Sequence, residues 1–307
     1  MSSASRPIVI VGSANMDLVV RVRQLPLPGE TLLAQGFETV PGGKGANQAI
    51  AAARLGGSVA LAGCVGTDAF GQRLHADLEK EGIDLSHFHH VAEQPTGIAA
   101  ITVATDGANT IAVALGANAS LRPQNMDDAE ALIAAAGLLV CQLETPLETV
   151  ERAIDLAMRH KTRVILNAAP AMPLADALLR KIDYLVVNES EASLISGITV
   201  ENIETAGRAA EALLKRGARH VLLTLGAQGL WYAGGDDETG GEHIPGIAVQ
   251  TVDTTAAGDT FIGGFAAGLA SGMNIGGAID LGQRAAAISV TRRGAQTSIP
   301  YRSELVA

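Results

Sequence analysis

The segment DTTAAGDTF, residues 253–261, combines an acidic side chain with small residues where a strand-like stretch passes into an apolar helix. The backbone N–H groups of Ala257, Gly258 and Asp259 have no partner inside such a helix, so they can converge with the helix dipole to form an anion hole. A carboxylate beside an anion hole can take the proton of an alcohol while charge develops nearby, as phosphoryl transfer to a hydroxyl requires. The alternative is that Asp259 only stabilises the first helical turn.

A second glycine-rich segment, GGKGAN at residues 42–47, leads into a predicted helix at 45–55. Glycines before a helix allow the backbone to approach a polar ligand closely, and Lys44 and Asn47 would point into the same cleft. The segment is not a Walker A loop, which has a longer glycine spacing and a Ser or Thr after the lysine. An ordinary glycine-rich turn is the alternative to a binding loop.

Further polar side chains follow predicted strands. Asn15 and Asp17 come after the strand at 8–11. A carboxylate there can accept hydrogen bonds from two neighbouring sugar hydroxyls, or the pair can simply form a turn. Glu144 comes just past the strand at 138–143, at the edge of a sheet where ligand sites collect.

Two more segments could contact a nucleotide. Asn188 and Glu191 follow the strand at 184–188, where a carboxylate can organise magnesium-bound water near phosphates. The same residues could instead cap the next helix. The glycine turn TLGAQG at 224–229 could support a nucleotide, or it could be a plain hairpin.

Strands and helices alternate through most of the chain, which predicts right-handed crossovers, a mostly parallel sheet and a layered α/β fold. The predicted strands span 8–11, 59–65, 138–143, 163–167, 184–188, 221–225, 229–233 and 249–252. The predicted helices span 45–55, 70–81, 127–136, 147–160, 174–180, 205–216, 256–271 and 278–291, with a further helix ending near Ser196. Strand regions near 14–40 and 97–115 fall outside this alternation, and we expect them to form a small sheet, or lid, over the ends of the main strands.

The composition limits the possible functions. With 307 residues, 48% of them hydrophobic, the chain can bury a sizeable core, and we expect 1–307 to be a single domain. Its net charge of −10 has the wrong sign for a general nucleic-acid binder. No apolar run approaches the roughly 20 residues that span a bilayer. Cys64 and Cys141 lie in apolar runs and are expected to be buried thiols. We therefore expect a cytoplasmic protein with no nucleic-acid or membrane partner.

Taken together, these segments resemble the ribokinase family of sugar kinases, also called the PfkB family, over essentially the whole chain. The resemblance rests on GSANMD at 12–17, GGKGANQA at 42–49, QLETP at 142–146, NESEA at 188–192, TLGAQG at 224–229, DTTAAGDTF at 253–261 and VTRRGAQTSIP at 290–300. It implies a three-layer α/β/α fold with a small β-sheet lid through which two copies form a homodimer. It also implies ATP-dependent phosphorylation of D-ribose at the 5-hydroxyl. The same chemistry on 2-deoxyribose, another sugar or a nucleoside stays open, as does a non-catalytic sugar- or nucleotide-binding protein on this fold.

The resemblance implies roles for individual residues. Asp259 would be the catalytic base, beside an anion hole formed by Ala256, Ala257 and Gly258. The residues that would hold the sugar are Asn15, Asp17, Gly42, Gly43, Lys44, Asn47, Glu144 and Asp259. Those that would contact the nucleotide are Asn188, Thr224, Gly226, Gly229, Gly258 and Gln283.

Two cations are implied as well. Mg²⁺, bound with ATP, would be held through water by Asn188 and Glu191. K⁺, as an activating monovalent cation, would lie beside the anion hole at Asp253, Thr255, Ser289, Arg292, Gly294 and Ser298. The wider family often reads GAGD where this chain reads AAGD at 256–259. Because alanine keeps its backbone N–H, we expect the anion hole to survive this change.

Overall fold

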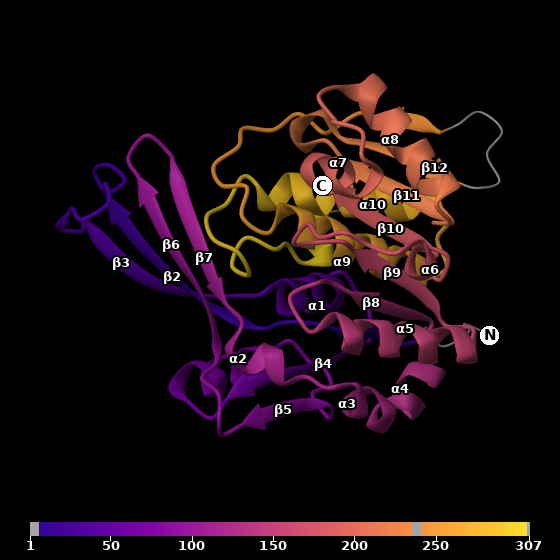
Figure 1. The fold of residues 1–307 in the computed structure, drawn as a ribbon, viewed down its shortest axis with the longest axis horizontal. Helices are drawn as coiled ribbons and strands as arrows, with labels where there is room; N and C mark the ends of the chain where they lie inside the picture. Colours follow the sequence, from indigo (N-terminus) through magenta and orange to yellow (C-terminus); the bar gives the residue numbers. More distant parts are fainter. Residues whose placement is uncertain (1–5, 235–240, 306–307) are drawn as a thin grey trace.

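The computed structural model describes residues 6–234 and 241–305 and contains two β-sheets (Figure 1). Within the described residues the larger sheet has nine strands in the order β13-β12-β11-β10-β9-β8-β1-β4-β5. The strands from β11 to β5 pair in parallel, and β12 and β13 add antiparallel pairs at one edge. Their bounds are β1 Ile8–Val11, β4 Val59–Gly66, β5 Phe88–Val91, β8 Leu138–Cys141, β9 Arg163–Asn167, β10 Tyr184–Asn188, β11 His220–Thr224, β12 Leu230–Gly234 and β13 Glu242–Ile244.

Strands β1 and β8 are apolar at every position because both faces of the sheet are covered. In β1, Val9 and Val11 belong to the hydrophobic cluster on one face, whereas Ile8 and Ile10 belong to the cluster on the other. Successive side chains of a strand point to opposite faces, so a strand buried on both faces loses the alternating pattern. This burial explains why the continuous apolar runs in the sequence predict these strands so well.

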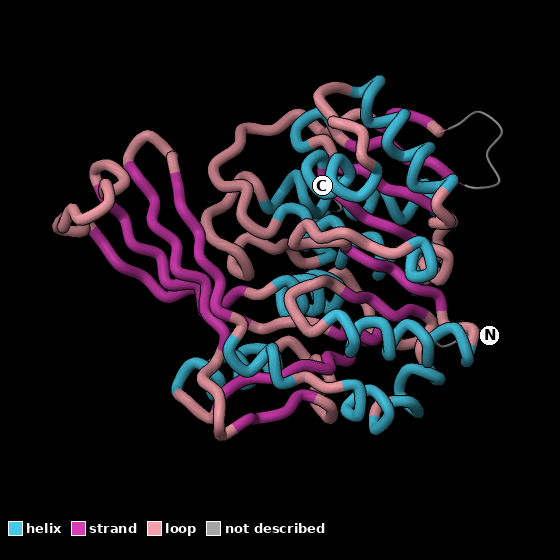
Figure 2. Tube along the Cα trace, viewed as in Figure 1, coloured by secondary structure: helices cyan, strands magenta, loops and turns pink. Residues whose placement is uncertain are grey.

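Helices cover both faces of the large sheet (Figure 2). The first cluster packs the sheet against α3 Pro123–Asp128, α4 Glu130–Ala135, α5 Leu147–His160, α6 Asp176–Leu179, α7 Glu189–Ser196 and α8 Ile203–Lys215. The second packs it against α1 Lys44–Arg54, α2 Ala69–Lys80, α9 Ala257–Ala270 and α10 Ile275–Ser289. The expected three-layer α/β/α class with a mostly parallel sheet is confirmed.

Small residues bring α1, α9 and α10 into close contact. A Cβ atom built on Gly263 would lie 2.4 Å from the Ala51 Cβ, and one built on Gly282 would lie 2.6 Å from the Phe261 carbonyl oxygen. Real Cβ atoms do not approach other atoms so closely, so only glycine fits at these crossings. This packing holds α9 against both α1 and α10.

The second sheet projects from the body (Figure 1). Its order is β3-β2-β6-β7, from β2 Asn15–Val22, β3 Gly36–Gly42, β6 Gly97–Ala104 and β7 Asn109–Ala114. Strand β2 begins where β3 ends, because Asn15 pairs with Gly42 in the register of these antiparallel strands. The strand regions expected near 14–40 and 97–115 therefore do form a separate small sheet.

The structure corrects three of the predicted elements. Residues 249–252 form no strand, and the Val252 N–H instead donates to the Val290 carbonyl beyond the end of α10. The helix predicted at 127–136 is two short helices, because α3 begins at Pro123 and the chain breaks between α3 and α4 at Ala129. The helix predicted at 174–180 is only the short α6.

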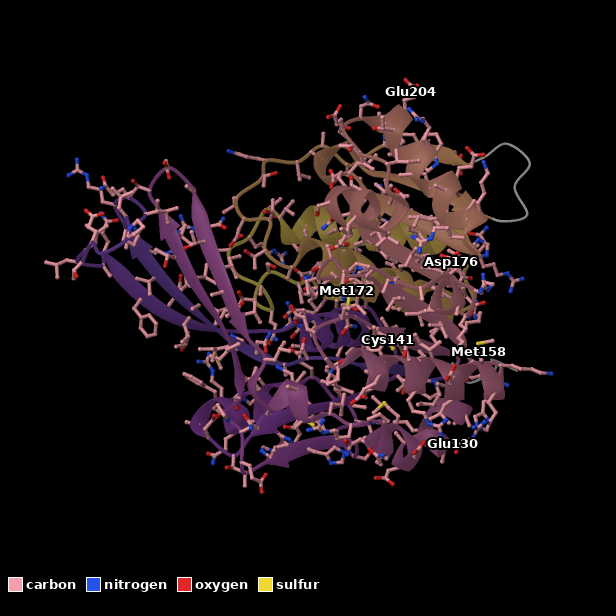
Figure 3. The ribbon with its side chains drawn as sticks, viewed as in Figure 1. Glu130, Cys141, Met158, Met172, Asp176 and Glu204 are labelled. Carbon is pink, nitrogen blue, oxygen red and sulfur yellow. The ribbon has the colours of Figure 1, made fainter. Side chains whose placement is uncertain are left out.

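Both cysteines are free and buried, as expected. Cys141, labelled in Figure 3, ends β8 and belongs to the hydrophobic cluster that contains the buried side chains of α5. Burial raises the pKa of the Cys64 thiol to about 11, so this group stays protonated at neutral pH. Across residues 6–234 and 241–305, none of the helices combines the length and the apolar character that crossing a membrane requires.

Candidate active site

The candidate site lies where the carboxyl ends of the parallel strands meet the N-terminus of α9. A cleft of about 600 Å³ is bordered there by Asn188 and Thr224, from the ends of β10 and β11, and by Gly258 and Asp259 from α9. Lys44, the first residue of α1, borders the same cleft. Ligands of open α/β sheets bind at this edge, where helix N-termini present unpaired N–H groups.

The first turn of α9 supplies backbone donors to this cleft. Ala256 caps the helix with a φ of 58°, in the left-handed region, and this turns the preceding segment into the helix. The Ala257 N–H donates to the Thr254 carbonyl at 3.2 Å. The N–H groups of Gly258 and Asp259 donate to no acceptor in the described part of the chain. A Cβ on Gly258 would meet no atom within 4 Å, so there is open space beside this turn.

Asp259 is held by two side-chain amides. Its side chain is buried, with 8% exposure. Asn47 donates from Nδ2 to its Oδ2 at 3.0 Å, and Gln48 donates from Nε2 to its Oδ1 at 2.9 Å. One amide on each oxygen fixes the plane of the carboxylate, and both amides come from α1, which packs against α9. The carboxylate therefore has a defined orientation before any ligand binds.

Glu144 is oriented in a similar way from the end of β8. The Ser13 hydroxyl donates to Glu144 Oε2 at 2.5 Å, and the Lys44 backbone N–H donates to the same oxygen at 3.1 Å. Ser13 Oγ also accepts from the Gly45 N–H at 3.4 Å. Both bonds to Glu144 use one oxygen, so Oε1 can accept a further donor. The structure thus links the ends of β1 and β8 to the start of α1.

The glycines at 42 and 43 make room for the polar groups of β2. A Cβ on Gly42 would lie 2.5 Å from Asp17 Oδ2. Gly43 has a φ of 90°, and a Cβ there would lie 2.6 Å from the Asn15 backbone nitrogen. Only glycine fits at both positions, and this brings Asn15 and Asp17 against the start of α1.

Asn15 is oriented by a residue that the sequence analysis did not select. Asn118 lies in a short 3₁₀ helix, Gly116–Ser120, and its Nδ2 donates to Asn15 Oδ1 at 2.7 Å. Asn118 Oδ1 accepts from the Ala14 N–H at 3.0 Å. A Cβ on Gly97 would lie 2.3 Å from Asn15 Oδ1, so the small sheet also needs glycine at this point.

Several charges crowd this region. The pKa of Asp17 is raised from 3.8 to about 7, mainly by burial and then by the charges of Glu144 and Asp259, against the opposing effect of Lys44. Burial alone would lower the pKa of Lys44, but Asp259 and Glu144, with smaller effects from Glu191 and Asp17, outweigh it and raise the pKa. Lys44 therefore stays charged among carboxylates, which suits a site for a polyhydroxylated ligand and phosphates.

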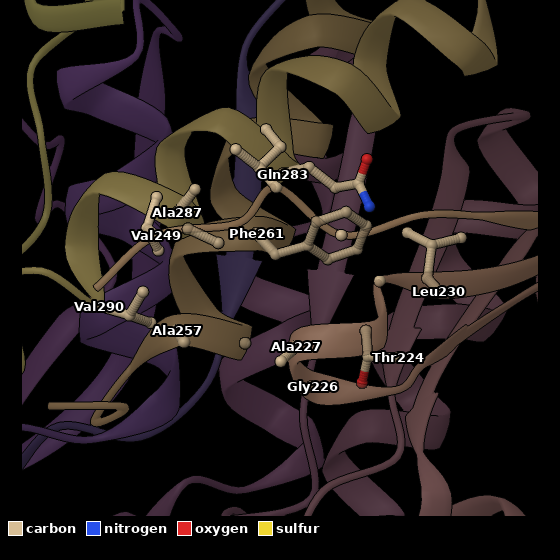
Figure 4. A pocket seen from close by; sticks show the side chains of 15 residues that line it. Thr224, Gly226, Ala227, Leu230, Val249, Ala257, Phe261, Gln283, Ala287 and Val290 are labelled. Carbon is tan, nitrogen blue, oxygen red and sulfur yellow. The ribbon is translucent and has the colours of Figure 1, made fainter. Parts of the chain in front are cut away.

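A second, more apolar cleft of about 670 Å³ lies beside the first (Figure 4). On one side is the β11–β12 hairpin with Thr224, Gly226 and Gly229, and on the other is α10 with Gln283. The remaining wall is apolar and includes Leu230, Ile247, Val249, Phe261, Ala286, Ala287 and Val290. Gln283 donates from Nε2 to the Pro245 carbonyl at 3.3 Å. A flat heteroaromatic ring with a polar edge matches such a lining.

The two clefts meet at Thr224, Ala257 and Gly258, which border both. The apolar cleft therefore leads to the N-terminus of α9, and the polar cleft continues from there to Asp259. This arrangement allows a nucleotide to lie in the apolar cleft with its phosphates at the helix N-terminus and an acceptor hydroxyl at Asp259.

Asn188 and Glu191 fit a role with Mg²⁺. They form the helix cap that the sequence left open: Asn188 Oδ1 accepts from the Glu191 N–H at 2.9 Å, and Glu191 Oε2 accepts from the Asn188 N–H at 2.9 Å. Both also border the polar cleft. Burial raises the pKa of Glu191, with Lys44 among the groups that oppose this effect. Carboxylate and amide oxygens suit Mg²⁺, which usually keeps several waters, so water-mediated binding at these residues is chemically consistent.

Of the six residues expected at a K⁺ site, three are joined by hydrogen bonds, and the side chains of the other three bond elsewhere. Asp253 Oδ1 accepts from the Thr255 N–H at 2.9 Å and hydroxyl at 2.6 Å, and Oδ2 accepts from the Gly294 N–H at 2.9 Å. Burial alone would raise the pKa of Asp253, but these hydrogen bonds outweigh it and lower the pKa. The side chains of the other three residues make bonds elsewhere: Ser289 to the Ala286 carbonyl, Ser298 to the Ala295 carbonyl, and Arg292 to Glu304. Carboxylate, carbonyl and hydroxyl oxygens are the ligands that a hard cation takes, so the groups at Asp253, Thr255 and Gly294 are chemically consistent with K⁺.

The sequence analysis missed two kinds of site residue. One kind is buried amides, Gln48, Gln142, Asn118 and Asn167, whose partners are distant in sequence. The other is the apolar wall of the second cleft. The spacing of Gln283, Ala286, Ala287 and Val290 on one face of α10 is the signal that could have found it.

Comparison with known proteins identifies the family. Residues 5–302 match the family described as pfkB family carbohydrate kinase. The chain therefore belongs to the pfkB family of carbohydrate kinases, which confirms the resemblance in the sequence.

Individual relatives are similar over nearly their whole length. The Haemophilus influenzae protein named ribokinase is 44% identical, over 97% of this chain and 97% of its own. The Salmonella typhi protein named deoxyribokinase is 37% identical, over 95% of each. Among solved structures, Arabidopsis thaliana ribokinase complexed with ribose and ATP is 32% identical, covers 98% of each chain and has a TM-score of 0.92.

Proposed function

We propose that this chain is an ATP-dependent kinase that phosphorylates D-ribose at the 5-hydroxyl, giving ribose 5-phosphate and ADP. The observation that carries the proposal is the buried carboxylate of Asp259, held by two amides where the polar cleft meets the first turn of α9. Relatives named ribokinase, 40–44% identical over at least 97% of this chain, support ribose as the acceptor.

In this mechanism Asp259 accepts the proton of the 5-hydroxyl as the hydroxyl oxygen attacks the γ-phosphorus of ATP. The new oxygen–phosphorus bond forms while the bond to the bridging β-γ oxygen breaks, and ADP leaves with that electron pair. The N–H groups of Gly258 and Asp259 stabilise the developing charge because they lie at the positive end of α9. Mg²⁺, when bound through water by Asn188 and Glu191, would neutralise phosphate charge.

The sugar would lie between α1 and the small sheet. Asn47 Oδ1 is buried and has no hydrogen-bond partner among the described residues, so a sugar hydroxyl can donate to it. Glu144 Oε1 offers a second acceptor, and Asp17 offers a carboxylate to neighbouring hydroxyls. Gly42 and Gly43 let the Asp17 side chain and the Asn15 backbone lie close against the start of α1.

A second candidate acceptor is 2-deoxyribose, because a relative named deoxyribokinase is 37% identical over 95% of this chain. The two sugars differ by the 2-hydroxyl. A buried acceptor that loses its hydroxyl partner is costly, so a site built around that group favours ribose strongly. The discrimination between these sugars therefore measures how much Asp17 and Glu144 depend on the 2-hydroxyl.

Three further features are part of the proposal. We propose that K⁺ activates the enzyme through the site at Asp253 beside the anion hole. We also propose a homodimer formed through the small sheet, supported by β7, which is exposed along its length and carries Ile111 and Val113. Phe37 on β3 is also exposed. The cytoplasm as the place of action stays a prediction.

The proposal is tested by ADP release from Mg-ATP with ribose, 2-deoxyribose, fructose, adenosine or no sugar, first in K⁺ and then in Na⁺. We expect ribose to give by far the highest rate. The variant Asp259→Asn is expected to lose several orders of magnitude in kcat with its fold intact. A residual rate above about a tenth of wild type would overturn the role of Asp259, and no sugar-dependent release would overturn the kinase itself.

A further inference from the structure

A chain of hydrogen-bonded, buried side-chain amides runs from the body of the fold and ends at the Asp259 carboxylate. Gln142 donates from Nε2 to Gln48 Oε1 at 2.6 Å, and Gln48 donates from Nε2 to Asp259 Oδ1 at 2.9 Å. Gln48 Nε2 also donates to Asn167 Oδ1 at 3.2 Å. Gln48 and Gln142 are both fully buried. The chain therefore connects β8 and β9 to the carboxylate through α1.

The ionised carboxylate determines the direction of every bond in this chain. A carboxylate only accepts hydrogen bonds, so Gln48 must turn its NH₂ group toward Asp259. Its carbonyl oxygen then faces Gln142, which must present its own NH₂ group in turn. Reversing either amide would place two acceptor oxygens in contact, in a buried region where electrostatic repulsion is strong.

Packing holds the chain of amides in place. A Cβ on Gly12 would lie 2.0 Å from Gln142 Oε1, so the glycine at the end of β1 makes room for this side chain. Asn167 is tied to the Val186 carbonyl through its Nδ2 at 3.3 Å. Among the described residues that border the two clefts, neither Gln48 nor Gln142 appears. The two glutamines therefore act on the site only through Asp259 and Asn167.

We propose that Gln48 is a positioning residue for phosphoryl transfer, and that Gln142 sets its orientation. Gln48 holds Oδ1, Asn47 holds Oδ2, and together they aim the carboxylate at the acceptor hydroxyl. This inference rests on the proposed role of Asp259 as the base. Misplacing a catalytic group by a fraction of an ångström lowers the rate of chemistry without removing any contact to the sugar.

The first test is Gln48→Met, which keeps the volume of the side chain and removes its hydrogen bonds. We expect kcat to fall by about tenfold to a hundredfold, the effect of losing one hydrogen bond to a charged group. We expect the KM for ribose to change by less than about threefold, because Gln48 does not border the cleft. Gln72→Met, the same substitution on the exposed face of α2, is the matched control and should leave both constants unchanged.

The second test separates orientation from general damage to the core. In Gln142→Glu, the new carboxylate cannot donate to Gln48 Oε1, so it drives the Gln48 amide to reverse and to point an oxygen at Asp259. We expect a loss of kcat at least as large as that of Gln48→Met. In the double variant, Gln142→Glu should add little to Gln48→Met, because its effect passes through Gln48. An effect of Gln142→Glu that persists fully in the Gln48→Met background would overturn the proposed orientation.

Asp259→Asn, measured beside these variants, distinguishes failure of the inference from failure of the mechanism. If Asp259→Asn is inactive while Gln48→Met keeps wild-type kcat, the positioning role is wrong and the base is not. If Asp259→Asn keeps substantial activity, the base assignment fails, and the positioning role fails with it. Gln48→Met is nearly isosteric, so the test stands even if Gln142→Glu, which buries a charge, does not fold.

Discussion

Asn118 donates a hydrogen bond from Nδ2 to Asn15 Oδ1 at 2.7 Å, although 103 positions separate the two residues in the sequence. The same Nδ2 group contacts the carbonyl oxygens of Ala14 and Leu115, at 3.3 and 2.9 Å. Asn118 therefore joins the start of β2 to the chain that leaves the small sheet. It also determines which edge of the Asn15 amide faces the proposed sugar site.

The variant Asn118→Asp tests this relationship. An aspartate of the same shape places an oxygen against three acceptor oxygens, so we expect the Asn15 amide to lose its fixed orientation. The KM for ribose should rise at least tenfold, and the unfolding midpoint should fall. Asn202→Asp at the exposed cap of α8 is a matched control, because aspartate also accepts the bond from the Thr205 N–H. Unchanged ribose affinity in Asn118→Asp would show that Asn15 needs no such support.

Asp17 predicts a coupling between sugar binding and proton release. Its pKa of about 7 in the ligand-free protein, against an ordinary value of 3.8, means that the carboxyl is largely protonated at pH 6. Sugar hydroxyls donate to the ionised form, so ribose binding should release a proton at pH 6 and none at pH 8.5. Affinity should fall by up to about tenfold per pH unit below 7. Titration calorimetry at pH 6, in two buffers of different ionisation enthalpy, measures the released proton.

The raised pKa of Asp17 also makes the stability of the ligand-free protein depend on pH. Because the folded-state pKa is raised, Asp17 favours the ligand-free fold most at pH values below 3.8, and this contribution is lost as the pH rises through about 7. Asp17→Asn removes the ionisable group. We expect this variant to lose both the proton release and this part of the pH dependence. Proton release that survives in Asp17→Asn would assign the coupling to another group.

The backbone conformation of Ala256 predicts that glycine at this position stabilises the folded protein. Its φ of 58° lies in the left-handed region, which costs a residue with a Cβ about 1–2 kcal/mol. Glycine removes this strain, but it destabilises the folded protein by about 0.4–1 kcal/mol because it raises the conformational entropy of the unfolded chain. The strain is the larger of the two, so Ala256→Gly should raise the unfolding midpoint by about 1–2 °C and leave kcat close to wild type. Ala212→Gly within α8, where φ is helical, should instead lower the midpoint.

Because Asp253 lies at the proposed K⁺ site, its substitution should remove the preference of the enzyme for K⁺ over Na⁺. Both carboxylate oxygens accept hydrogen bonds, and Asp253→Asn would place an NH₂ group against either Thr255 or the Gly294 N–H. We expect the ratio of the rates in K⁺ and Na⁺ to fall to about one, with Asp106→Asn, in an exposed turn, as the control. A variant that keeps the wild-type ratio would place the cation elsewhere.

The sequence predicts those parts of the molecule whose signal is local. The strands at 163–167 and 184–188 have the predicted bounds because burial on both faces requires an apolar run in the middle of each strand. Strand β5, Phe88–Val91, was missed because it carries two histidines and exists only through pairing with β4. Residues 249–252 were wrongly predicted as a strand, since nothing in a short run of residues reveals whether a pairing partner is present.

The candidate site likewise contains some residues that the sequence marks by a local motif and others that it does not. Asp259 and Lys44 stand out because of the glycine-rich motifs around them, and their position in one cleft follows from the edge at which parallel strands end. Gln48 and Gln142 lie within the motifs GGKGANQA and QLETP but have no local pattern that marks them. Their roles depend on a contact across 94 positions, which only the folded chain provides.

The small sheet is rooted in the proposed sugar site, because β2 starts at Asn15 and β3 ends at Gly42, opposite each other in register. A bound sugar would therefore lie at the base of a sheet that extends roughly 25 Å away from it, the length of an eight-residue strand. A partner that held the far end of the sheet would therefore restrain the same two strands that carry Asn15 and Gly42 at the proposed sugar site.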